Sequence, residues 1–236
     1  MNLFTRSLSS RLSKLAAITI LAGGTVLFNS CSKDPAPAQE FSFLNITNAS
    51  PTLASYNVYA GANKVNPAAL GFGGNVTYGQ YVPGTINVKF TTTSNTESVF
   101  NKDVKLEANT AHSLFLIGKS GALDYLVTKD ELGSIASDKA FIRFINLSPD
   151  ALALDLAVKD GATLIADKAY KASSTFTETE AKTYIFVIKD KATGAVKKEL
   201  ASTEFKAGRS YTIIASGLLV PSDIEQTFTG QIITNQ

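Results

Sequence analysis

The sequence predicts an all-β protein made of two tandem antiparallel β-sandwich domains of the immunoglobulin-like or transthyretin-like type. Two observations support this prediction. Short segments rich in aromatic and β-branched residues recur roughly every ten residues, with turn residues between them, and no segment keeps a helical period. In addition, the second half of the chain repeats the first, which indicates two copies of one domain.

The repeat is clearest where residues 43–51 (FLNITNASP) align with residues 141–149 (FIRFINLSP) at an offset of 98. Two further pairs of segments align at this offset or at one residue more: 85–88 with 183–186, and 106–114 with 205–213. A nearly constant offset over most of each unit is hard to obtain by chance. A period of this length fits a small independent domain, so we expect one sandwich over residues 41–132 and a second over 139–236.

The expected strands occupy equivalent places in the two copies. In the first copy they are 41–46, 56–59, 86–90, 114–117 and 123–127, and in the second 141–145, 154–158, 184–189 and 211–215. Asp160-Gly161 predicts a tight hairpin and Thr193-Gly194 a second turn. Asn109 and Gly208 each mark a turn before the penultimate strand of a copy.

Residues 1–30 are typical of an export signal. The basic residues Arg6, Arg11 and Lys14 precede an apolar run at 15–28. A helix of about 14 residues rises only about 21 Å, which is too short for a hydrocarbon core of about 30 Å. We therefore expect a signal peptide that is removed on export, and not a permanent membrane span.

Cys31 is the only cysteine and directly follows the apolar run and Ser30. A single cysteine cannot form an internal disulfide, and exported proteins normally avoid a stray thiol. The arrangement resembles bacterial lipoprotein signals, in which a small residue precedes the lipid-modified cysteine. Phe28, where leucine is more usual, resembles the looser signals of Bacteroidota. We expect a lipid on Cys31, a tether over 31–40, and an outer membrane lipoprotein that is periplasmic or surface-exposed.

The charge balance argues against a nucleic-acid partner. The whole chain has 22 basic and 20 acidic residues, and loss of residues 1–30 leaves 19 basic and 20 acidic ones. The positive excess therefore belongs to the export signal. Nucleic-acid binding requires a clustered basic face, for which the mature sequence has no candidate.

Several motifs resemble a known family. They are Ser-Pro after the first strand of each copy, Asn57 or Asp155 in the second strand, and Ala-Gly-x-x-Tyr-Thr at 207–212. The family is domain of unknown function 4397, whose members occur as tandem domains in exported bacterial proteins. The resemblance extends from residue 41 to about residue 219. It implies β-sandwiches outside the cytoplasm and no known reaction.

The sequence holds no convincing catalytic group. His112 is the only histidine, so a histidine-based triad would have to use it. It aligns with Tyr211 at the start of a strand, and we interpret it as a half-buried strand residue. With Cys31 assigned to the lipid, no ordinary zinc site remains. We expect no catalytic residue, metal or cofactor, and a protein that is not an enzyme.

Two weaker features leave binding open. Tyr56, Tyr59, Tyr78 and Tyr81 flank a glycine-rich segment at 71–74. We take Tyr78 and Tyr81 as candidate ligand-binding residues, since exposed tyrosines stack on sugars or anchor protein partners. The chain has no tryptophan, which weakens a carbohydrate platform. Asp150, Asp155 and Asp160 recur at intervals of five, and weak calcium binding is left open.

The leading hypothesis is a non-catalytic cell-envelope lipoprotein that serves binding, adhesion or scaffolding. Its expected partners are the membrane, through the lipid anchor, and a protein or glycan ligand of unknown identity. The first alternative is an accessory polysaccharide-binding lipoprotein of a nutrient-uptake system. The second is an unrecognised hydrolase.

Overall fold

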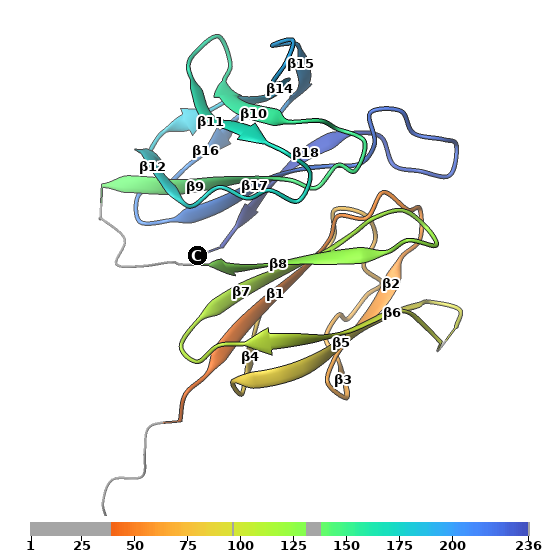
Figure 1. Cartoon of the computed structure of the whole chain (residues 1–236). Coiled ribbons are helices and arrows are strands. Elements are labelled where there is room, and N and C mark those ends of the chain that lie inside the picture. The colour runs from red at the N-terminus through yellow and green to blue at the C-terminus, as the bar shows by residue number, and fades with distance from the viewer. Residues whose placement is uncertain (1–38, 96, 131–137, 236) are drawn as a thin grey trace, which may run out of the picture. The chain divides into compact units, whose positions relative to one another are not determined.

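The computed structural model describes residues 39–95, 97–130 and 138–235, which belong to one compact unit, Gln39–Gln236. These residues form strands and turns without any helix, so the predicted all-β sandwich class is confirmed (Figure 1). It follows that no helix within them is long and apolar enough to cross a membrane. The predicted export signal, Cys31 and the segment 131–137 lie outside the described residues.

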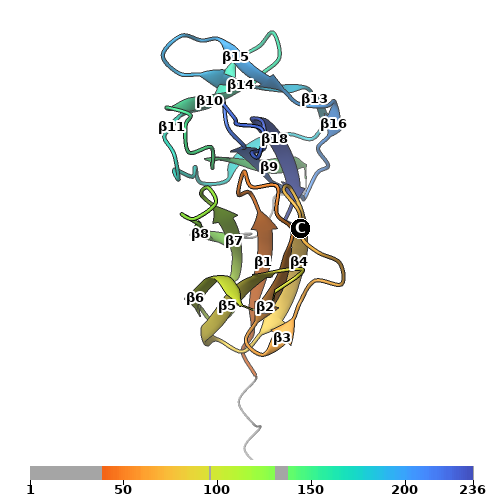
Figure 2. The same ribbon diagram turned by 90° about the vertical axis from the view of Figure 1, so that its right-hand side faces the viewer.

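The first half forms a sandwich of two four-stranded sheets, in the orders β4-β1-β7-β8 and β3-β2-β5-β6 (Figures 1 and 2). Its strands are β1 Ser42–Asn48, β2 Tyr56–Ala60, β3 Asn63–Lys64, β4 Asn75–Tyr81, β5 Gly84–Thr92, β6 Ser98–Leu106, β7 Ala111–Ile117 and β8 Asp124–Asp130.

The second half repeats this arrangement, with sheets in the orders β12-β9-β17-β18 and β11-β10-β14-β15 and a small pair β13-β16. Its strands are β9 Lys139–Asn146, β10 Leu154–Val158, β11 Thr163–Lys168, β12 Thr177–Glu180, β13 Thr183–Tyr184, β14 Phe186–Asp190, β15 Val196–Glu199, β16 Thr203–Glu204, β17 Ser210–Ser216 and β18 Thr229–Thr234.

One strand pair in each half is parallel, so the sheets of the predicted antiparallel sandwich are mixed. β1 runs parallel to β7, and β9 runs parallel to β17. The cause is the chain path. After β1 the chain crosses to the opposite sheet, returns as β4 on one side of β1, crosses again, and comes back as β7 on the other side of β1, so β1 and β7 begin at the same end of the sandwich.

Each sandwich has its own core between its two sheets. In the first half, Leu44 and Ile46 of β1 pack against residues of the opposite sheet such as Val58 and Phe90. In the second half the equivalent core contains a stack of aromatic rings, with Phe205 4.6 Å from Tyr211 and 5.1 Å from Phe186 between ring centroids. Such aromatic contacts add to the stability gained by burial.

A third core covers the other face of β1-β7 and β9-β17. Phe115 and Ile117 of β7 pack there with Ile145 of β9, Ile214 of β17 and Ile233 of β18. In the sheets β4-β1-β7-β8 and β12-β9-β17-β18, the central strands, β1 with β7 and β9 with β17, are therefore covered on both faces, which is why every residue of β17 is buried. We call the packed faces of these two sheets the internal interface.

The repeated Asn-x-Ser-Pro motif fixes the end of the first strand in each half. Asn146 Nδ2 donates to the carbonyl oxygens of Leu152 (2.9 Å) and Lys168 (3.1 Å), and its Oδ1 accepts from Ser148 N (3.1 Å). Ser148 Oγ donates to Gly217 O (2.8 Å). The first half repeats the scheme, with Ser50 Oγ donating to Gly118 O (2.7 Å). The motif ties the loop after one parallel strand to the loop after the other.

The expected strands all lie within or across observed ones, and the turn signals are confirmed. Asp160 and Asn109 both adopt φ +55, and Gly194 and Gly208 both adopt φ +70. The sequence reading missed the polar edge strands, which have no apolar alternation; β12, for example, is Thr-Glu-Thr-Glu. In the second half the expected strand 184–189 is interrupted at Ile185 between β13 and β14.

Gly217→Ala should lower the free energy of unfolding by more than about 2 kcal/mol. Gly217 has φ +81, and a Cβ there would overlap the backbone carbonyl of Thr227, which cannot move cheaply. Gly194→Ala is the matched control, because Gly194 has φ +70 but open space around it, so only backbone strain is added. Urea denaturation measures both, and equal losses would contradict this reading.

Candidate functional site

Four loops meet at one end of the described chain. Because β1 and β7 are parallel, the loops that follow them lie at the same edge, and the same holds for β9 and β17. The halves are joined there, since Gln226 N donates to Pro51 O (2.7 Å) and Lys119 pairs with Glu225 (3.2 Å). Loops at the ends of a sandwich are common binding surfaces.

Backbone hydrogen bonds hold the longest of these loops, residues 218–228, in one shape. The Asp150 carboxylate accepts from the backbone N of Leu219 and of Val220, each at 3.0 Å. Glu225 accepts from Ser222 N (3.0 Å), which together with its other contacts lowers the pKa of the Glu225 carboxyl. A loop tied at both ends loses little conformational entropy on binding.

Exposed aliphatic side chains stand on these loops. Leu53 is 56% exposed, Leu152 76%, Val220 81% and Ile224 71%. We call these four residues the tip patch. Exposed clusters of this kind mark interaction sites more often than single exposed residues do. The tip patch offers apolar contact area and no nucleophile or base, so its chemistry is that of binding.

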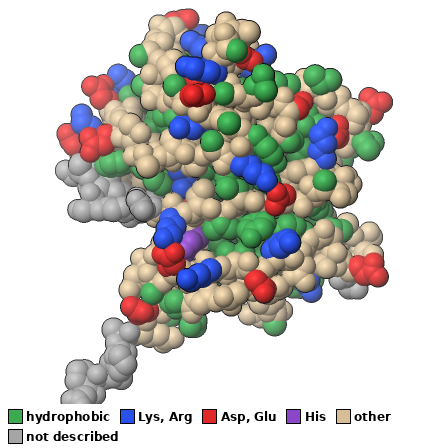
Figure 3. Space-filling view, in the orientation of Figure 1, with side chains coloured by type: hydrophobic (Ala, Val, Ile, Leu, Met, Phe, Trp, Pro, Cys, Tyr) green, Lys and Arg blue, Asp and Glu red, His purple; other side chains and the backbone are tan. Residues whose placement is uncertain are grey.

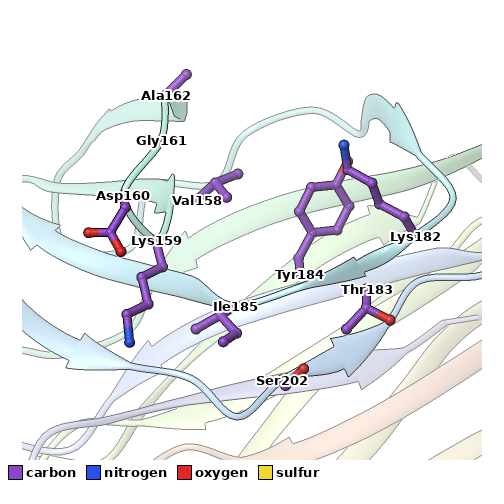
Figure 4. A pocket seen from close by; sticks show the side chains of 10 residues that line it. All are labelled: Val158, Lys159, Asp160, Gly161, Ala162, Lys182, Thr183, Tyr184, Ile185 and Ser202. Carbon is purple, nitrogen blue, oxygen red and sulfur yellow. The ribbon is translucent and has the colours of Figure 1, made fainter.

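A separate hollow of about 570 Å³ lies at the hairpin between β10 and β11 (Figure 4). Its floor is apolar, with Val158 and Ile185, and lysines stand on its rim. Tyr184 offers little ring surface, because it is only 8% exposed and Lys182 lies 5.3 Å from its ring centre. Both rim lysines also have carboxylate partners, with Lys159 pairing with Glu199 at 2.9 Å. The hollow is therefore a weaker candidate site than the tip patch.

His112 is a structural residue of the first sandwich. It is 2% exposed, its Nδ1 lies 3.3 Å from Ser42 Oγ, and its Nε2 accepts from Glu107 N (3.5 Å). Both ring nitrogens thus face partners inside the fold. Ser113, the next residue, points to the other face of the sheet, as the strand alternation predicts, and donates to Asp130 (2.6 Å).

Tyr78 lies in a closed chain of polar contacts across the internal interface. Its hydroxyl donates to Asp130 Oδ2 (2.5 Å) and accepts from Asn235 Nδ2 (2.8 Å). Asn235 Oδ1 accepts from Thr212 Oγ1 (2.6 Å), and Thr212 Oγ1 accepts from Arg143 Nε (2.8 Å). An ion pair of 2.5 Å between Arg143 Nη2 and Asp130 Oδ1 closes the chain. We call these five residues the polar ring.

The polar ring is buried, and its hydrogen bonds lead in one direction from Arg143 through Thr212, Asn235 and Tyr78 to Asp130. Asp130 is 3% exposed, Arg143 1% and Asn235 5%. Each hydroxyl or amide accepts from one neighbour and donates to the next, an arrangement in which hydrogen bonds reinforce one another. The Arg143 guanidinium also lies 4.7 Å from the ring centre of Phe176. The ring therefore joins the two halves and leaves no reactive group open to solvent.

The other predicted site residues are spread over the fold. Tyr81 is half-buried against the first core, and burial raises the pKa of its hydroxyl. Asp155 accepts from Asp167 N (2.7 Å) and so fixes an irregularity in the pairing of β10 with β11, while Asp150 serves the loop described above. Residues 39–95, 97–130 and 138–235 contain no group of three potential metal ligands. The ligand-binding role of Tyr78 and Tyr81 stays a prediction.

Charges of both signs are mixed on the face seen in Figure 3, without a continuous basic surface. The tip patch and the polar ring were both missed by sequence reasoning. The tip patch consists of single apolar residues inside loops, which carry no periodic signal. The internal interface had one signal, the run Leu-Phe-Leu-Ile at 114–117, because a strand apolar at successive positions is buried on both faces.

Comparison with known families identifies the chain. Residues 42–157 match the family described as Domain of unknown function (DUF4397). The chain belongs to the DUF4397 family. The match covers the first half and reaches β10 of the second half, so it is shorter than the expected 41 to about 219. No curated protein matches the DUF4397 chain in sequence.

Several solved structures are weakly similar to this DUF4397 protein. The N-terminal domain of AlgF from P. aeruginosa is 16% identical, with a TM-score of 0.30 over 39% of this chain and 98% of that one. A family 41 carbohydrate-binding module from streptococcal virulence factors is 11% identical, with a TM-score of 0.23 over 73% and 92%. A family 26 module of Eubacterium rectale Amy13K, in complex with maltoheptaose, is 10% identical, with a TM-score of 0.25 over 81% and 96%. These TM-scores are too low to establish a common fold.

Tyr78→Phe should make the protein less sensitive to alkali. Burial, and then the Asp130 carboxylate, raise the pKa of Tyr78 above its ordinary value of 10.0. The folded state therefore holds this proton more tightly than the unfolded state, and the resulting stability is complete below about pH 10 and is lost as the pH rises further. Burial also raises the pKa of Tyr81 and Tyr170, so the wild type loses stability through several groups.

Urea denaturation at a series of pH values measures this effect. Between about pH 9.5 and 11, the free energy of unfolding should fall less steeply in Tyr78→Phe than in the wild type. Tyr59→Phe, outside the polar ring, is the control and should follow the wild type. A Tyr78→Phe curve that runs parallel to the wild-type curve would contradict the prediction.

Proposed function

We propose that this DUF4397 protein is a non-catalytic binding module of the cell envelope that recognises a protein partner through the tip patch. The observation that carries the proposal is the exposure of Leu53, Leu152, Val220 and Ile224 on loops whose backbone is already fixed. Aliphatic side chains gain free energy when a partner removes them from water, at about 25 cal/mol per Å². Because the loop is already ordered, little of this free energy is offset by a loss of conformational entropy on binding.

The partner is expected to match the tip in shape and charge. Asp223 and Glu225 stand beside Ile224, and Lys119 already pairs with Glu225. An apolar partner surface with a basic rim would complement this arrangement. Sugars are a poorer fit, because they bind mainly through aromatic stacking and polar groups, and the tip patch has no aromatic residue.

The position of the tip suits a chain anchored at its N-terminus. Gln39, the first described residue, precedes β1, whereas the tip loops follow the far end of β1 and β9. If Cys31 carries a lipid, the chain would leave its anchor at one end of β1 and present its binding loops at the other. In the outer membrane lipoprotein proposed from the sequence, the tip patch would then be free to meet a partner.

The glycan-binding alternative has its own candidate sites. Tyr81 and the hollow of Figure 4 are the places where a sugar would bind. A histidine-based hydrolase is the least supported function, because His112 is buried with both ring nitrogens facing structural partners. The Tyr78 hydroxyl is hydrogen-bonded within the polar ring, so Tyr78→Ala would also disturb the internal interface. Tyr81→Ala is therefore the better test of glycan binding.

The double substitution Val220→Ser, Ile224→Ser should weaken partner binding at least tenfold without changing the fold, since both side chains are exposed. Val82→Ser is the matched control, because Val82 is 69% exposed and lies outside the tip patch. Chemical cross-linking on intact cells of the native host, followed by identification of the linked protein, should recover the same partner with the wild type and Val82→Ser only.

Recovery of the same partner with the double variant would exclude the tip patch as the site. Retention on a polysaccharide panel that is lost in Tyr81→Ala, with no protein partner recovered, would favour the glycan-binding alternative.

Cys31→Ser should abolish lipid attachment. Cells fed a fatty-acid analogue should label the wild-type protein and leave Cys31→Ser unlabelled, because the lipid is added to the thiol. Ser30→Ala, which keeps a small residue before the cysteine, is the control and should remain labelled. Labelling of Cys31→Ser would show that Cys31 is not the anchor.

A further inference from the structure

The two faces that form the internal interface are equivalent surfaces of the two repeats. The offset of 98 relates Asn45 of β1 to Arg143 of β9. His112 pairs with Lys129 in the first half and its counterpart Tyr211 pairs with Thr234 in the second, so Asp130 corresponds to Asn235. Equivalent sheets thus pack face to face through equivalent positions.

Contacts from the edge strand of each half to the other half also run both ways, from nearby but not identical positions of β8 and β18. Asp124 of β8 pairs with Lys171, which precedes β12 in the second half. In return, Gln231 of β18 donates to Gly73 O (2.8 Å), and Gly73 precedes β4 in the first half. The offset of 98 makes Gly73 the counterpart of Lys171. The interface therefore has the form of a two-fold, isologous contact, such as normally joins two identical subunits.

A two-fold contact between equivalent faces creates a problem of choice. We call the interface side of the sheet in the first half the first face, and that in the second half the second face. A first face has the shape to pack on the second face of its own chain, but also on the first face of another chain. The apolar core of the interface cannot distinguish these pairings, because Phe115 and its counterpart Ile214 are both large and apolar. Any selectivity must come from positions where the repeats differ in charge or hydrogen bonding.

The polar ring occupies such positions. Arg143 and Asp130 carry opposite charges, whereas their counterparts Asn45 and Asn235 are neutral. If two first faces packed together, each Asp130 carboxylate would be buried opposite Asn45 of the other chain, which carries no positive charge. A pair of second faces would bury two guanidinium groups with no carboxylate. Only a first face against a second face puts the two charges together, at 2.5 Å.

We infer that the polar ring makes the internal interface selective, so that the first repeat pairs with the second repeat and not with the same repeat of another chain. The net stability of a buried ion pair is small, but a buried charge left without its partner is strongly unfavourable. The charges therefore act mainly by excluding the like pairings. The surface fits the other repeat of this chain, and two copies of the protein are kept from joining through like faces.

Asn235→Asp tests this inference with one nearly isosteric change. It places a carboxylate on the second face, which already carries Arg143, and so makes that face complementary to itself. The probe is the chain lacking residues 1–30, with Cys31→Ser, and the measurement is sedimentation equilibrium up to about 1 mM, comparable with the effective concentration of a tethered domain. We expect Asn235→Asp to dimerise at least tenfold more tightly than the parent chain.

Two further variants separate selective pairing from a merely loosened interface. Asn45→Asp adds a buried carboxylate to the first face, which has no cation, and should destabilise the chain without producing a dimer. Asn45→Arg combined with Asn235→Asp provides an opposite charge for each charge within one chain, and should return the association of the protein to the level of the parent chain.

A folded Asn235→Asp that associates no more strongly than the parent would overturn the inference, and so would equal dimerisation of Asn45→Asp. If Asn235→Asp does not fold, as judged by circular dichroism, Asn45→Arg is the replacement variant. It adds a positive charge to the first face, which already holds Asp130, and so makes that face complementary to itself. A monomeric, folded Asn45→Arg would then overturn the inference.

Discussion

The ion pair between Arg143 and Asp130 joins two sheets whose central strands are covered on both faces, and the packing of the two halves depends on that burial. Ordinary sandwiches bury one face of each sheet and leave the other to water. Here the sheets around β1-β7 and β9-β17 are covered twice, once by their own partner sheet and once by each other. The apolar residues supply the free energy of this contact, and the charged residues determine which faces meet.

The same contact explains why the loops that carry the tip patch lie together, although they come from both halves. Each parallel strand pair directs its two following loops to one edge, and the packing of the sheets brings the two edges side by side. The bond from Gln226 N to Pro51 O is possible only because of that packing. The tip patch is therefore a product of the paired repeats, and a single repeat would present only part of it.

Much of the fold could be predicted from the sequence because its signals are local. Short β-rich segments, the turn residues and the repeated Asn-x-Ser-Pro motif each act within a few residues, and the structure confirms the class they predict. The parallel pairing of β1 with β7 could not be predicted, because it depends on how the chain passes between two sheets. Edge strands such as β12 could not be predicted either, because they are held by hydrogen bonds to the neighbouring strand and show no apolar alternation.

The candidate site was harder to predict, for a different physical reason. Tyr78 is unusual by its position near a glycine-rich segment, but its hydroxyl bonds to Asp130, far away in sequence, and to Asn235 in the other repeat. Contacts of this range have no sequence pattern. Leu152 and Val220 look like ordinary loop residues, and only the fold shows that they are exposed together.

The direction of β1 has a mechanical consequence for a protein held at one end and bound at the other. A pull on the chain before Ser42 and on the loop after Asn48 acts along the strand, while the hydrogen bonds of β1 to β7 and β4 run across it. Six residues of β1 pair with β7, so these bonds bear the load in shear and have to break together instead of one after another. The strand that leads from the chain start to the loops is thus oriented to transmit force without unravelling.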